Sequence, residues 1–486
     1  MKKTFILLVI VMIYSQLIFA QSTTWPMNGK IRVYFNHPVY TTVSSGTNAV
    51  YLNSCIADTL VKYITRAKYT IDCAIYNASS SSTMTPVITA INAAKTRGLT
   101  IRWIDNGAST NTAVSSLSSS INKLSSPTTS GYGIMHCKFM IIDANSTTAT
   151  DPIVWTGSTN WSEEQFNEDY NNVVIIQDQP LAQAYTAEFN EMWGSTTATP
   201  NSTNAKFGSH KTDPLSIHSF TIGGKTVELY FSPTDGVNNH IVSTINSAGT
   251  DLYFGVYTFT YNTDATDIVA RHTAGVYTAG IIDSYSEYGT TSPPYTACTS
   301  CPYSILNSGL GSSLLKVFPV TSYEIYHSKF VIADPSNPNS DPQVLTGSHN
   351  WTSSANSEND ENTLIIHDAT VANMYYQSFF QNFKDMGGTL TILTGVNDIA
   401  PVNNDVYIYP NPAVEGSPVY LNINPALNLA DAKLVIYDIL GNTLKEFVHL
   451  NNQQTAIDCG IQIKGMYFYR LFDGNNPVKT GKFLLQ

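Results

Sequence analysis

The sequence predicts an α/β protein that consists of two copies of one domain followed by a small all-β domain. Three observations carry this prediction. A long motif-bearing stretch occurs twice, at offsets of 177 to 196 residues. Within each copy, short apolar runs bounded by turn residues alternate with amphipathic stretches, which indicates strands alternating with helices. The last eighty or so residues carry only short alternating runs, a pattern typical of a small β-sandwich.

Length and composition set the frame for these domains. The chain has 486 residues, about three times a typical domain of ~150 residues, so two or three domains are expected. Hydrophobic residues make up 43%, enough for sizeable cores, whereas charged residues reach only 13% against the usual ~25%. The formal net charge is −11. Because phosphate neutralisation needs Lys and Arg, this balance excludes a protein whose main task is to grip a nucleic-acid backbone.

The N-terminus predicts a signal peptide over residues 1–20. After the basic pair Lys2-Lys3, an apolar run extends over residues 5–19, and Ala20 offers a cleavage point. The run is too short to span a membrane comfortably and lacks a basic stop-transfer flank. We therefore expect an exported protein that begins near residue 21 rather than a membrane-anchored one.

The duplication is clearest around a ten-residue motif. Residues 134–143 (IMHCKFMIID) recur as residues 325–334 (IYHSKFVIAD), and the GSTNW run at 157–161 recurs as GSHNW at 347–351. We expect two homologous halves, 21–205 and 206–400, arranged around a pseudo-two-fold axis. Such an axis brings equivalent residues together, so the motif histidines of the two halves are expected to meet. Upstream segments also correspond, 31–35 with 227–231 and 71–76 with 252–257.

Each half repeats the same order of elements. Strands are expected over the paired upstream segments, because these are short apolar runs bounded by turn residues. Helices are expected over Pro86–Arg97 and Leu181–Trp193, where apolar residues recur at helical spacing. The Ser- and Thr-rich stretch 115–130 predicts a flexible loop, and 201–220 predicts the connection between the halves.

The motif residues suit chemistry at a phosphodiester. Side chains at i and i+2 of a strand point to the same side, so His136 and Lys138 face one pocket, as do His327 and Lys329. Only histidine titrates near neutral pH without help, so two imidazoles supply a nucleophile and a proton donor. Lysine ammonium groups and asparagine amides stabilise charge on the phosphate oxygens, and serine hydroxyls add further donors. The asparagines and serines are Asn160, Asn350, Ser158 and Ser348.

The doubled pattern His-x-Lys-x4-Asp followed by Gly-Ser-x-Asn resembles the phospholipase D superfamily. The resemblance covers roughly residues 30–385, with the motif residues matched in both copies. It implies an α-β-α sandwich in each half and hydrolysis or transfer at a phosphodiester, at one site shared by both halves. It also implies that His136 attacks phosphorus to form a phosphohistidine and that His327 acts as acid and base. No metal or other cofactor is implied, because the lysines already supply positive charge.

One position departs from the family pattern. In the family, a Glu eleven residues after the motif Asn often hydrogen-bonds a catalytic imidazole and fixes its tautomer. The second half has Glu361 there, whereas the first half has Asn171. An amide orients an imidazole but stabilises imidazolium less well than a carboxylate does. Asp169 and Glu168 are alternative partners in the first half.

Other residues near the motifs have structural interpretations. Asp143 and Asp334, the motif aspartates, are expected to support the site by closing loop hydrogen bonds. Cys137 is expected to face away from the pocket because neighbouring residues of a strand point to opposite sides. Among the six cysteines, Cys298 and Cys301 form the only close pair, which favours a local disulfide over free thiols in an exported protein.

Residues 403–486 have a signature of their own. They contain Tyr409-Pro-Asn-Pro412, Gly465-Met-Tyr-Phe-Tyr-Arg470 and a final Lys479–Leu485 run. This order of motifs is similar to the sorting domain of the type IX secretion system. The resemblance implies a small β-sandwich, contact with the secretion machinery and export across the outer membrane. A carbohydrate-binding or adhesive module is the alternative. Strands are predicted at 433–438, 466–472 and 482–485.

Three functions fit these observations. The first is a secreted or cell-surface phosphodiesterase, a phospholipase D-like hydrolase acting on phospholipid head groups. The second is a metal-independent nuclease on DNA or RNA, disfavoured because residues 21–400 hold 17 Lys and Arg against 29 Asp and Glu. The third is a non-catalytic surface binding protein, disfavoured because every motif His, Lys and Asn is intact. A monomer is expected, and the Tyr-rich segments 253–261 and 285–303 are either ordinary loops or a lip for transient membrane-surface contact.

Overall fold

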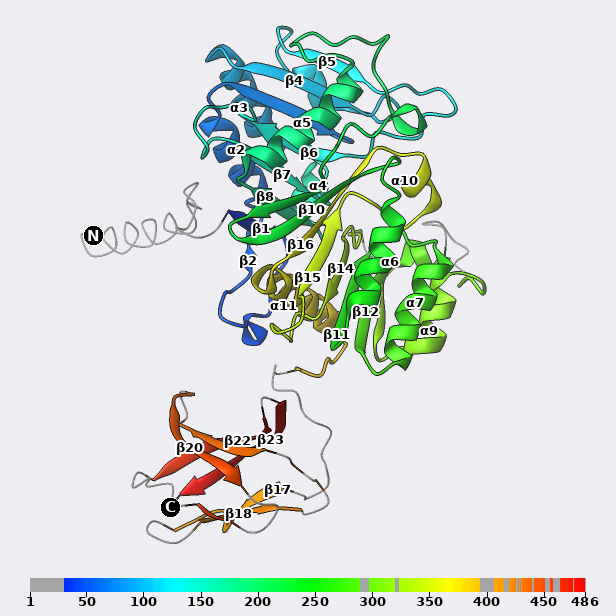
Figure 1. Cartoon of the computed structure of the whole chain (residues 1–486). Helices are drawn as coiled ribbons and strands as arrows, with labels where there is room; N and C mark the ends of the chain where they lie inside the picture. The colour runs from blue at the N-terminus through cyan, green and yellow to red at the C-terminus, as the bar shows by residue number, and fades with distance from the viewer. Residues whose placement is uncertain are drawn as a thin grey trace, which may run out of the picture. The chain divides into compact units, whose positions relative to one another are not determined.

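The computed structural model consists of two compact units, residues 1–392 and 393–486, shown in Figure 1. The signal peptide predicted over residues 1–20 lies outside the described residues, and so does Cys459. The domain limits predicted at residues 205 and 400 stay predictions. The structure describes residues 30–288, 297–319, 323–393, 406–414, 419–424, 427, 429, 431–438, 441–450, 455–457, 464–474 and 476–485.

The first half of the larger unit is an eight-stranded mixed sheet with helices on both faces. Across the sheet the strands are β2 (Val50–Tyr51), β1 (Ile31–Phe35), β8 (Asn172–Ile176), β7 (Ile153–Gly157), β6 (Lys138–Ile142), β3 (Thr70–Ile75), β4 (Thr100–Asp105) and β5 (Asn122–Ser125). The helices are α2 (Ile56–Arg66), α3 (Met84–Thr96), α4 (Glu163–Asn167) and α5 (Gln179–Trp193), with short 3₁₀ turns at Thr41–Val43 and Thr112–Ser116.

The second half repeats this sheet. Its strands are, in order, β13 (Leu315–Phe318), β12 (Tyr277–Asp283), β11 (Asp251–Val256), β14 (Lys329–Ala333), β15 (Gln343–Gly347), β16 (Glu361–His367), β10 (Lys225–Ser232) and β9 (Ser219–Ile222). The helices are α6 (Val237–Ser247), α7 (Asn262–Thr273), α8 (Ser284–Tyr288), α9 (Pro302–Leu310), α10 (Ser353–Ser357) and α11 (Ala369–Asp385). Seven consecutive strands therefore correspond between the halves, and the sheets differ only at the edge where β2 or β9 pairs.

The central strands are buried on both faces, which explains their nearly continuous apolar sequences. All five residues of β6 and all five of β14 are buried. A sheet covered by helices on both sides has no solvent-facing side chains to alternate with buried ones. The duplicated α/β architecture predicted from the alternating pattern is thus confirmed.

The long helices α5 and α11 begin at equivalent aspartates, the residues that follow the repeated apolar runs of β8 and β16. The side chain of Asp178 accepts a hydrogen bond from the first turn of α5, and that of Asp368 accepts two from the first turn of α11. Such N-caps satisfy backbone N–H groups that have no partner within the helix. α5 ends at Gly194, whose φ of 73° is a left-handed conformation that glycine adopts without a steric penalty.

The core of the larger unit has three parts, and the central one joins the halves. Buried side chains from β6, α5, β14 and α11 share it, among them Phe139, Phe189, Phe330 and Phe379. An outer cluster packs α2 and α3 on the first sheet, and another packs α6, α7 and α9 on the second (Figure 1). Each half is therefore an α-β-α sandwich whose inner helix layer lies in a core common to both halves.

Two equivalent asparagines connect the sheets within this shared core. Asn172 accepts a hydrogen bond from the Tyr375 hydroxyl at 2.9 Å through Oδ1. In the opposite direction, Asn362 donates from Nδ2 to Thr156 Oγ1 at 2.8 Å. Each residue lies at the start of a central strand, β8 or β16, and reaches into the other half. The hydrogen bonds fix the register of one half against the other.

The segment 115–130 differs from the sequence prediction, and the segment 201–220 contains more regular structure than the prediction specified. The stretch 115–130, predicted as a flexible loop, contributes β5, which pairs in parallel with β4 at the edge of the sheet. The four residues of β5 are half-buried or exposed, as suits a strand at the edge of a sheet. The connection at 201–220 is also more ordered than a linker. It contains a 3₁₀ turn at Gly208–His210, the first residues of β9, and the fully buried side chain of Lys211.

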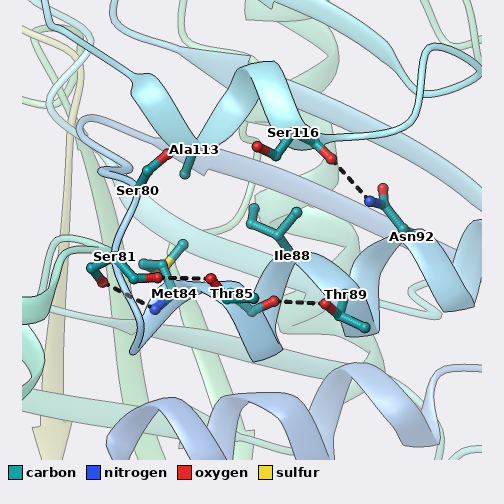
Figure 2. A pocket seen from close by; sticks show the side chains of 9 residues that line it. All are labelled: Ser80, Ser81, Met84, Thr85, Ile88, Thr89, Asn92, Ala113 and Ser116. Atoms are coloured by element: carbon teal, nitrogen blue, oxygen red, sulfur yellow. Dashed lines mark hydrogen bonds between the residues drawn. The ribbon is translucent and has the colours of Figure 1, made fainter.

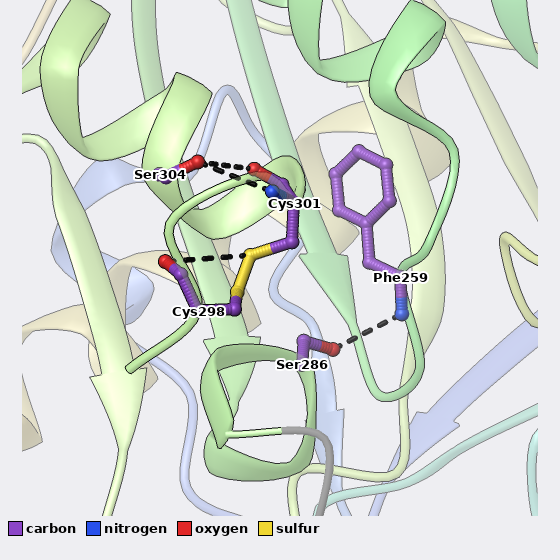
Figure 3. The surroundings of a disulfide bond; sticks show 5 residues. All are labelled: Phe259, Ser286, Cys298, Cys301 and Ser304. Carbon is purple, nitrogen blue, oxygen red and sulfur yellow. Dashed lines mark hydrogen bonds between the residues drawn. A yellow bond between two sulfur atoms is a disulfide. The ribbon is translucent and has the colours of Figure 1, made fainter. Parts of the chain in front are cut away.

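The disulfide favoured by the Cys298–Cys301 spacing is formed (Figure 3). It lies directly before α9, and the backbone N–H of Cys301 donates to the Ser304 hydroxyl at 3.2 Å. Nearby, Phe259 donates its backbone N–H to the Ser286 hydroxyl at 3.0 Å, which attaches α8 to the loop after β11. The disulfide therefore braces the start of α9. The cysteines at 55, 73 and 137 are free thiols.

The smaller unit contains two antiparallel sheets around one apolar cluster. One sheet has β17 (Val406–Tyr409), β18 (Val419–Ile423) and β21 (Thr455–Ile457), and the other has β20 (Thr443–Leu450), β19 (Ala432–Tyr437), β22 (Gly465–Asp473) and β23 (Asn476–Leu485). The strands predicted at 466–472 and 482–485 lie within β22 and β23, and the strand predicted at 433–438 overlaps β19. Over the described ranges of the whole chain, no helix is both long and apolar enough to cross a membrane.

Candidate active site

The two motif segments occupy equivalent places in the two sheets. His136 lies in the extended segment that leads into β6, and His327 in the segment that leads into β14. Lys138 and Lys329 are the first residues of those strands. Each ammonium group donates to the carbonyl oxygen of the histidine two residues before it, at 2.6 Å in both halves. Each lysine is therefore tied to the backbone of its own histidine, and the expectation that both side chains face one pocket stays a prediction.

Each histidine takes its ring partner from the opposite half. Nδ1 of His136 lies 2.8 Å from Oε2 of Glu361, at the start of β16. Nδ1 of His327 lies 3.0 Å from Oδ1 of Asn171, just before β8. Both imidazoles are buried, with 6% and 4% of the residue surface exposed. Neither histidine has its ring partner without the other half.

Backbone hydrogen bonds hold the exchanged segments together. His136 donates its backbone N–H to the Asp360 carbonyl at 2.9 Å, and Asp360 donates back to Ile134 at 3.0 Å. On the other side of the site, Tyr170 donates to the Ile325 carbonyl at 2.9 Å. The residues that flank each ring partner thus pair with the residues that flank each histidine. These backbone hydrogen bonds bring the ring partner from the second half to His136 and the ring partner from the first half to His327.

The hydrogen bonds also decide which ring nitrogen faces the site. A carboxylate only accepts, so His136 donates from Nδ1 to Glu361 and leaves Nε2 free. The amide group of Asn171 donates from Nδ2 to the Gln165 carbonyl at 3.1 Å, so its oxygen faces His327 and accepts from Nδ1. Nε2 is therefore the nitrogen left for reaction in His136, while His327 has a further hydrogen bond to the Ser158 backbone. Asp169, an alternative partner expected from the sequence, accepts instead from the Ile325 backbone N–H at 2.9 Å.

The motif serines have a different contact from the one expected. The Ser158 hydroxyl donates to Asn171 Oδ1 at 2.8 Å, and the Ser348 hydroxyl donates to Glu361 Oε2 at 2.6 Å. A hydroxyl has one hydrogen to donate, so neither hydroxyl is free to donate to a phosphate oxygen in this arrangement. The serines support the site by orienting the ring partners of the histidines.

The motif asparagines lie in the loops after β7 and β15. Asn160 is buried and donates from Nδ2 to Gln165 Oε1 at 3.4 Å, while its Oδ1 is buried without a hydrogen-bond partner. Asn350 Oδ1 is likewise buried without a partner. Buried amide oxygens of this kind are uncommon. The unpartnered atoms are acceptors, so they do not themselves stabilise a phosphate anion, which the amide N–H groups were expected to do.

The motif aspartates lie at the far ends of the strands from the histidines. Asp143 and Asp334 adopt left-handed φ values of 52° and 54°. The carboxylate of Asp143 accepts backbone N–H groups at 68–70, and that of Asp334 accepts those at 249–251. They close the loops before β3 and β11, which is the structural role predicted from the sequence.

Burial and crowding of positive charge dominate the electrostatics of the site. Burial lowers the pKa of His136 to about 4, although Glu361 opposes the shift, and it lowers the pKa of Lys138 to about 7. Burial and the charges of Lys329, Lys138 and His136 hold the pKa of His327 well below its usual value. Burial alone raises the pKa of a carboxyl, but the charge and hydrogen bond of His136 bring that of Glu361 below its usual range. The two histidine–lysine pairs therefore lie close enough to affect each other.

Sequence comparison of the halves did not single out three further groups around the site. Tyr76 and Tyr257 follow β3 and β11, at positions that the repeat itself equates. Their rings lie 4.7 and 5.1 Å from the rings of His136 and His327. The third group is Lys211 in the connection between the halves, which forms buried ion pairs beside the site. The tyrosines could have been found from the sequence, because they occupy equivalent positions in the two halves. Lys211 has no counterpart in the other half.

A separate cavity of about 470 Å³ lies against α3 in the first half. Figure 2 shows it lined by neutral side chains of α3 and the turn at Thr112–Ser116, with Asn92 donating to the Ser116 carbonyl at 3.0 Å. None of its lining residues is a motif residue. A possible cation-binding group of one histidine and two aspartates also lies away from the motifs, at Asp213, His218 and Asp235. There His218 Nδ1 is already occupied by the Leu229 carbonyl, at 2.9 Å.

The fold and the site together define a class of protein: a duplicated α/β domain with one histidine–lysine site assembled from both halves. Residues 60–193 and 241–383 match the family described as "Cardiolipin synthase, PLD-like domain". The match covers more than half of the chain, so the chain belongs to this phospholipase D-like family. Residues 407–486 match the "Secretion system C-terminal sorting domain", which identifies the smaller unit as a sorting domain of the type IX secretion system.

Individual relatives are distant. The mitochondrial cardiolipin hydrolase of Drosophila melanogaster is 31% identical over 150 residues, 28% of this chain and 57% of that protein. The phospholipase D of Rickettsia prowazekii (strain Madrid E) is 26% identical over 181 residues, 37% of this chain and 79% of that protein. The chain spans between 26% and 59% of the length of the three cardiolipin hydrolases that it matches. The crystal structure of a phosphatidylserine synthase from Haemophilus influenzae Rd KW20 aligns with a TM-score of 0.47 at 15% identity, over 72% of this chain and 86% of that one.

Proposed function

We propose that this protein is an exported phosphodiesterase of the phospholipase D type that hydrolyses a phospholipid at its head group. The observation that carries the proposal is the pair of buried histidines, each beside its own lysine and each oriented from the opposite half. Two imidazoles oriented through Nδ1 and two ammonium groups are the parts that cleavage of a phosphodiester requires.

The reaction has two steps through a phosphohistidine. Nε2 of His136 attacks phosphorus, and the bond from phosphorus to the leaving oxygen breaks while Nε2 of His327 gives that oxygen a proton. Water then attacks phosphorus, His327 takes a proton from the water, and the phosphorus–nitrogen bond breaks. The products are an alcohol and a phosphate monoester. The negative charge of the bound diester favours the protonated form of His327, whose pKa is lowered in the free protein.

Lys138 and Lys329 stabilise the charge that develops on the non-bridging oxygens. Each uses one N–H on a backbone carbonyl and keeps two others for neighbouring groups. Glu361 stabilises the positive charge that His136 gains on becoming phosphorylated, because it accepts the Nδ1 proton. Asn171 holds His327 in the matching orientation without adding charge. The supporting contacts of Ser158 and Ser348 fix both ring partners.

A phospholipid is the preferred substrate because the chain is acidic. The net charge of −11 disfavours a long polyanion, whose binding needs a groove of many Lys and Arg residues. Some of the matched relatives are named as cardiolipin hydrolase and phospholipase D, which agrees with a lipid diester. The second candidate is a nuclease that uses the same histidines on single-stranded DNA or RNA.

Export follows from the sorting domain at 407–486, which places the site at the cell surface or in the medium. The predicted signal peptide over residues 1–20 supplies passage across the inner membrane, and the secretion machinery is the expected partner of the smaller unit. Contact with the membrane surface is transient in this proposal, and the protein acts as a monomer because one chain contains both halves of the site.

The test compares substrates with the purified chain that begins at residue 21. Phosphatidylcholine vesicles are assayed for choline release and single-stranded DNA for cleavage, both in the presence of a metal chelator. We expect choline release that His136→Ala and His327→Ala abolish. His240→Ala is the matched control, because His240 lies on α6 outside the motifs and stacks on Tyr230. Cleavage of DNA alone transfers the proposal to the nuclease, and activity on neither substrate contradicts both.

A further inference from the structure

Two tyrosines at equivalent positions lie beside the two histidine–lysine pairs. Tyr76 follows β3 and Tyr257 follows β11. The backbone N–H of Tyr76 donates to the carbonyl of Cys137, the residue between His136 and Lys138, at 2.8 Å. Tyr257 makes the same bond to Ser328, the corresponding residue of the second motif, at 2.9 Å. The sheet therefore fixes each tyrosine beside its own motif.

The ring faces meet the lysine ammonium groups. Nζ of Lys138 lies 4.9 Å from the centre of the Tyr76 ring, and Nζ of Lys329 lies 5.0 Å from the centre of the Tyr257 ring. A cation within about 6 Å of a ring centre is attracted to the negative face of the ring, most strongly where water is excluded. The same geometry recurs at equivalent positions of the two halves, so the contact belongs to the duplicated unit and not to one half alone.

The hydrogen-bonding capacity of each ammonium group explains the need for a ring. An ammonium group has three N–H donors, and one of them donates to the carbonyl of its histidine. Both lysine side chains are buried, so bulk solvent has little access to the remaining donors. A ring face accepts one of them and leaves the third for a phosphate oxygen. A ring also adds no negative charge that would repel the phosphate.

Several charged groups act on the two lysine ammonium groups. Glu361 favours the charged form of both lysines, and Asp169 and Asp283 favour that of Lys329. Lys138 opposes the charge of Lys329. Glu361 Oε2 accepts from His136 and Asp169 accepts from the Ile325 backbone, whereas Oε1 of Glu361 is buried without a hydrogen-bond partner. Besides the histidine carbonyls, the faces of the tyrosine rings contact the ammonium groups.

We propose that Tyr76 and Tyr257 are positioning residues of the site, whose ring faces hold the ammonium groups of Lys138 and Lys329 toward a phosphate oxygen. The inference rests on the proposed function, because it treats that site as the place where a phosphate is bound. It assigns the role to the aromatic face and gives none to the phenol hydroxyl. The two rings act as a matched pair, one for each half.

The test varies the ring electronics without changing its shape. Tyr76 is replaced by Phe and then by phenylalanines that carry one, two and three fluorine atoms, each of which weakens the negative ring face. Tungstate, a tetrahedral oxyanion, is the probe, and its affinity for the full chain from residue 21 is measured by calorimetry. We expect Tyr76→Phe to bind within about twofold of the unchanged chain. Affinity then falls stepwise with fluorination, by roughly tenfold over the series.

A matched control uses the same fluorinated series at Phe330. This residue follows Lys329 directly, but its ring packs on Tyr375 and Phe379 in the central core. Fluorination there is expected to leave tungstate affinity unchanged. A flat response of affinity to ring electronics at both Tyr76 and Tyr257 overturns the proposal, and so does a loss caused by Tyr76→Phe alone, which assigns the role to the hydroxyl.

The probe separates this inference from the proposed function. Tungstate binding needs no hydrolysis, so a chain that binds tungstate through the rings but cleaves no diester contradicts only the proposed activity. A chain that cleaves diesters with an affinity independent of ring electronics contradicts only the inference. Absence of tungstate binding by the unchanged chain removes the oxyanion site and overturns the inference.

Discussion

Glu361, in the second half of the protein, accepts a hydrogen bond from Nδ1 of His136 in the first half, at 2.8 Å. Asn171 and His327 form the reciprocal contact at 3.0 Å. The duplicated fold is thus completed by exchange, since each half supplies a histidine and the partner of the other histidine. The exchange is chemically unequal, because one partner is a carboxylate and the other an amide. This inequality gives the two histidines different expected responses to mutation.

Glu361→Gln removes the negative charge beside His136 while keeping the shape of the side chain. We expect kcat for diester hydrolysis to fall by roughly 100- to 10,000-fold, because the ring loses the group that fixes its tautomer and stabilises its positive charge. Steady-state kinetics with a thermal melt as the folding control measure the effect. A change of less than about threefold in a folded variant contradicts a role for this carboxylate in catalysis.

Asn171→Asp places a carboxylate beside His327. A nearby negative charge favours imidazolium, so the pKa of His327 rises and the ring keeps its second proton to higher pH than in the unchanged chain. Titration of ¹⁵N-labelled imidazole by NMR measures this shift. The variant also loses the amide donor to the Gln165 carbonyl, which costs about 1–3 kcal/mol of stability. An unchanged or lowered pKa of His327 shows that residue 171 does not control the charge of the ring.

Lys138 predicts a pH dependence of oxyanion binding. Burial lowers the pKa of this lysine to about 7, and a lysine carries its charge only below its pKa. Tungstate affinity of the unchanged chain is therefore expected to fall as the pH rises through about 7. Lys138→Arg keeps its charge at high pH, so its affinity falls less steeply, with the remaining slope due to Lys329. Parallel profiles for the two proteins contradict the assignment to Lys138.

Lys211 predicts a large effect on stability. Its ammonium group is fully buried, pairs with Glu188 and lies 3.2 Å from Asp360, the residue before Glu361. Lys211→Met leaves two buried carboxyls without their cation, which we expect to lower the free energy of unfolding by roughly 3–5 kcal/mol in urea denaturation at pH 7.

The loss caused by Lys211→Met is expected to shrink at lower pH. Burial already raises the pKa of Glu188 to about 7 and that of Asp360 to about 6, and removal of the cation raises both further. Protonation then neutralises the buried pair below about pH 6. Adding Glu188→Gln to Lys211→Met is expected to recover part of the stability at pH 7. Equal stability losses at pH 5 and pH 7 speak against charge as the cause.

Removal of the smaller unit is expected to change only where the protein is located. Deletion of residues 403–486 removes the sorting domain and is expected to retain the protein in the periplasm, because the secretion machinery has lost its recognition element. Fractionation and immunoblotting of the cell envelope and the medium measure the distribution. A deletion variant that still reaches the medium in normal amounts contradicts the sorting role.

Much of the fold can be predicted from the sequence because the two copies keep the same order of motifs and elements. The same short apolar runs, turn residues and helix caps recur at a nearly constant offset, so each half supports the assignment of the other. The segment that was predicted wrongly, β5 within the Ser- and Thr-rich stretch, is an edge strand without a strong apolar pattern. An edge strand is defined by pairing with its neighbour, and local composition does not record that pairing.

By itself the sequence determined the duplication, the residue types of the motifs and the departure at Asn171, because each is a property of residues near one another in the chain. The tertiary structure decided which residues meet. His136 and Glu361 are 225 positions apart, as the ring contact and backbone pairing show. Packing of the two halves in the shared core brings these residues together. The same packing determines which groups the serine hydroxyls contact and buries Lys211. Partners at such distances are chosen by the packing of the two halves around their pseudo-two-fold axis, and no local pattern encodes that choice.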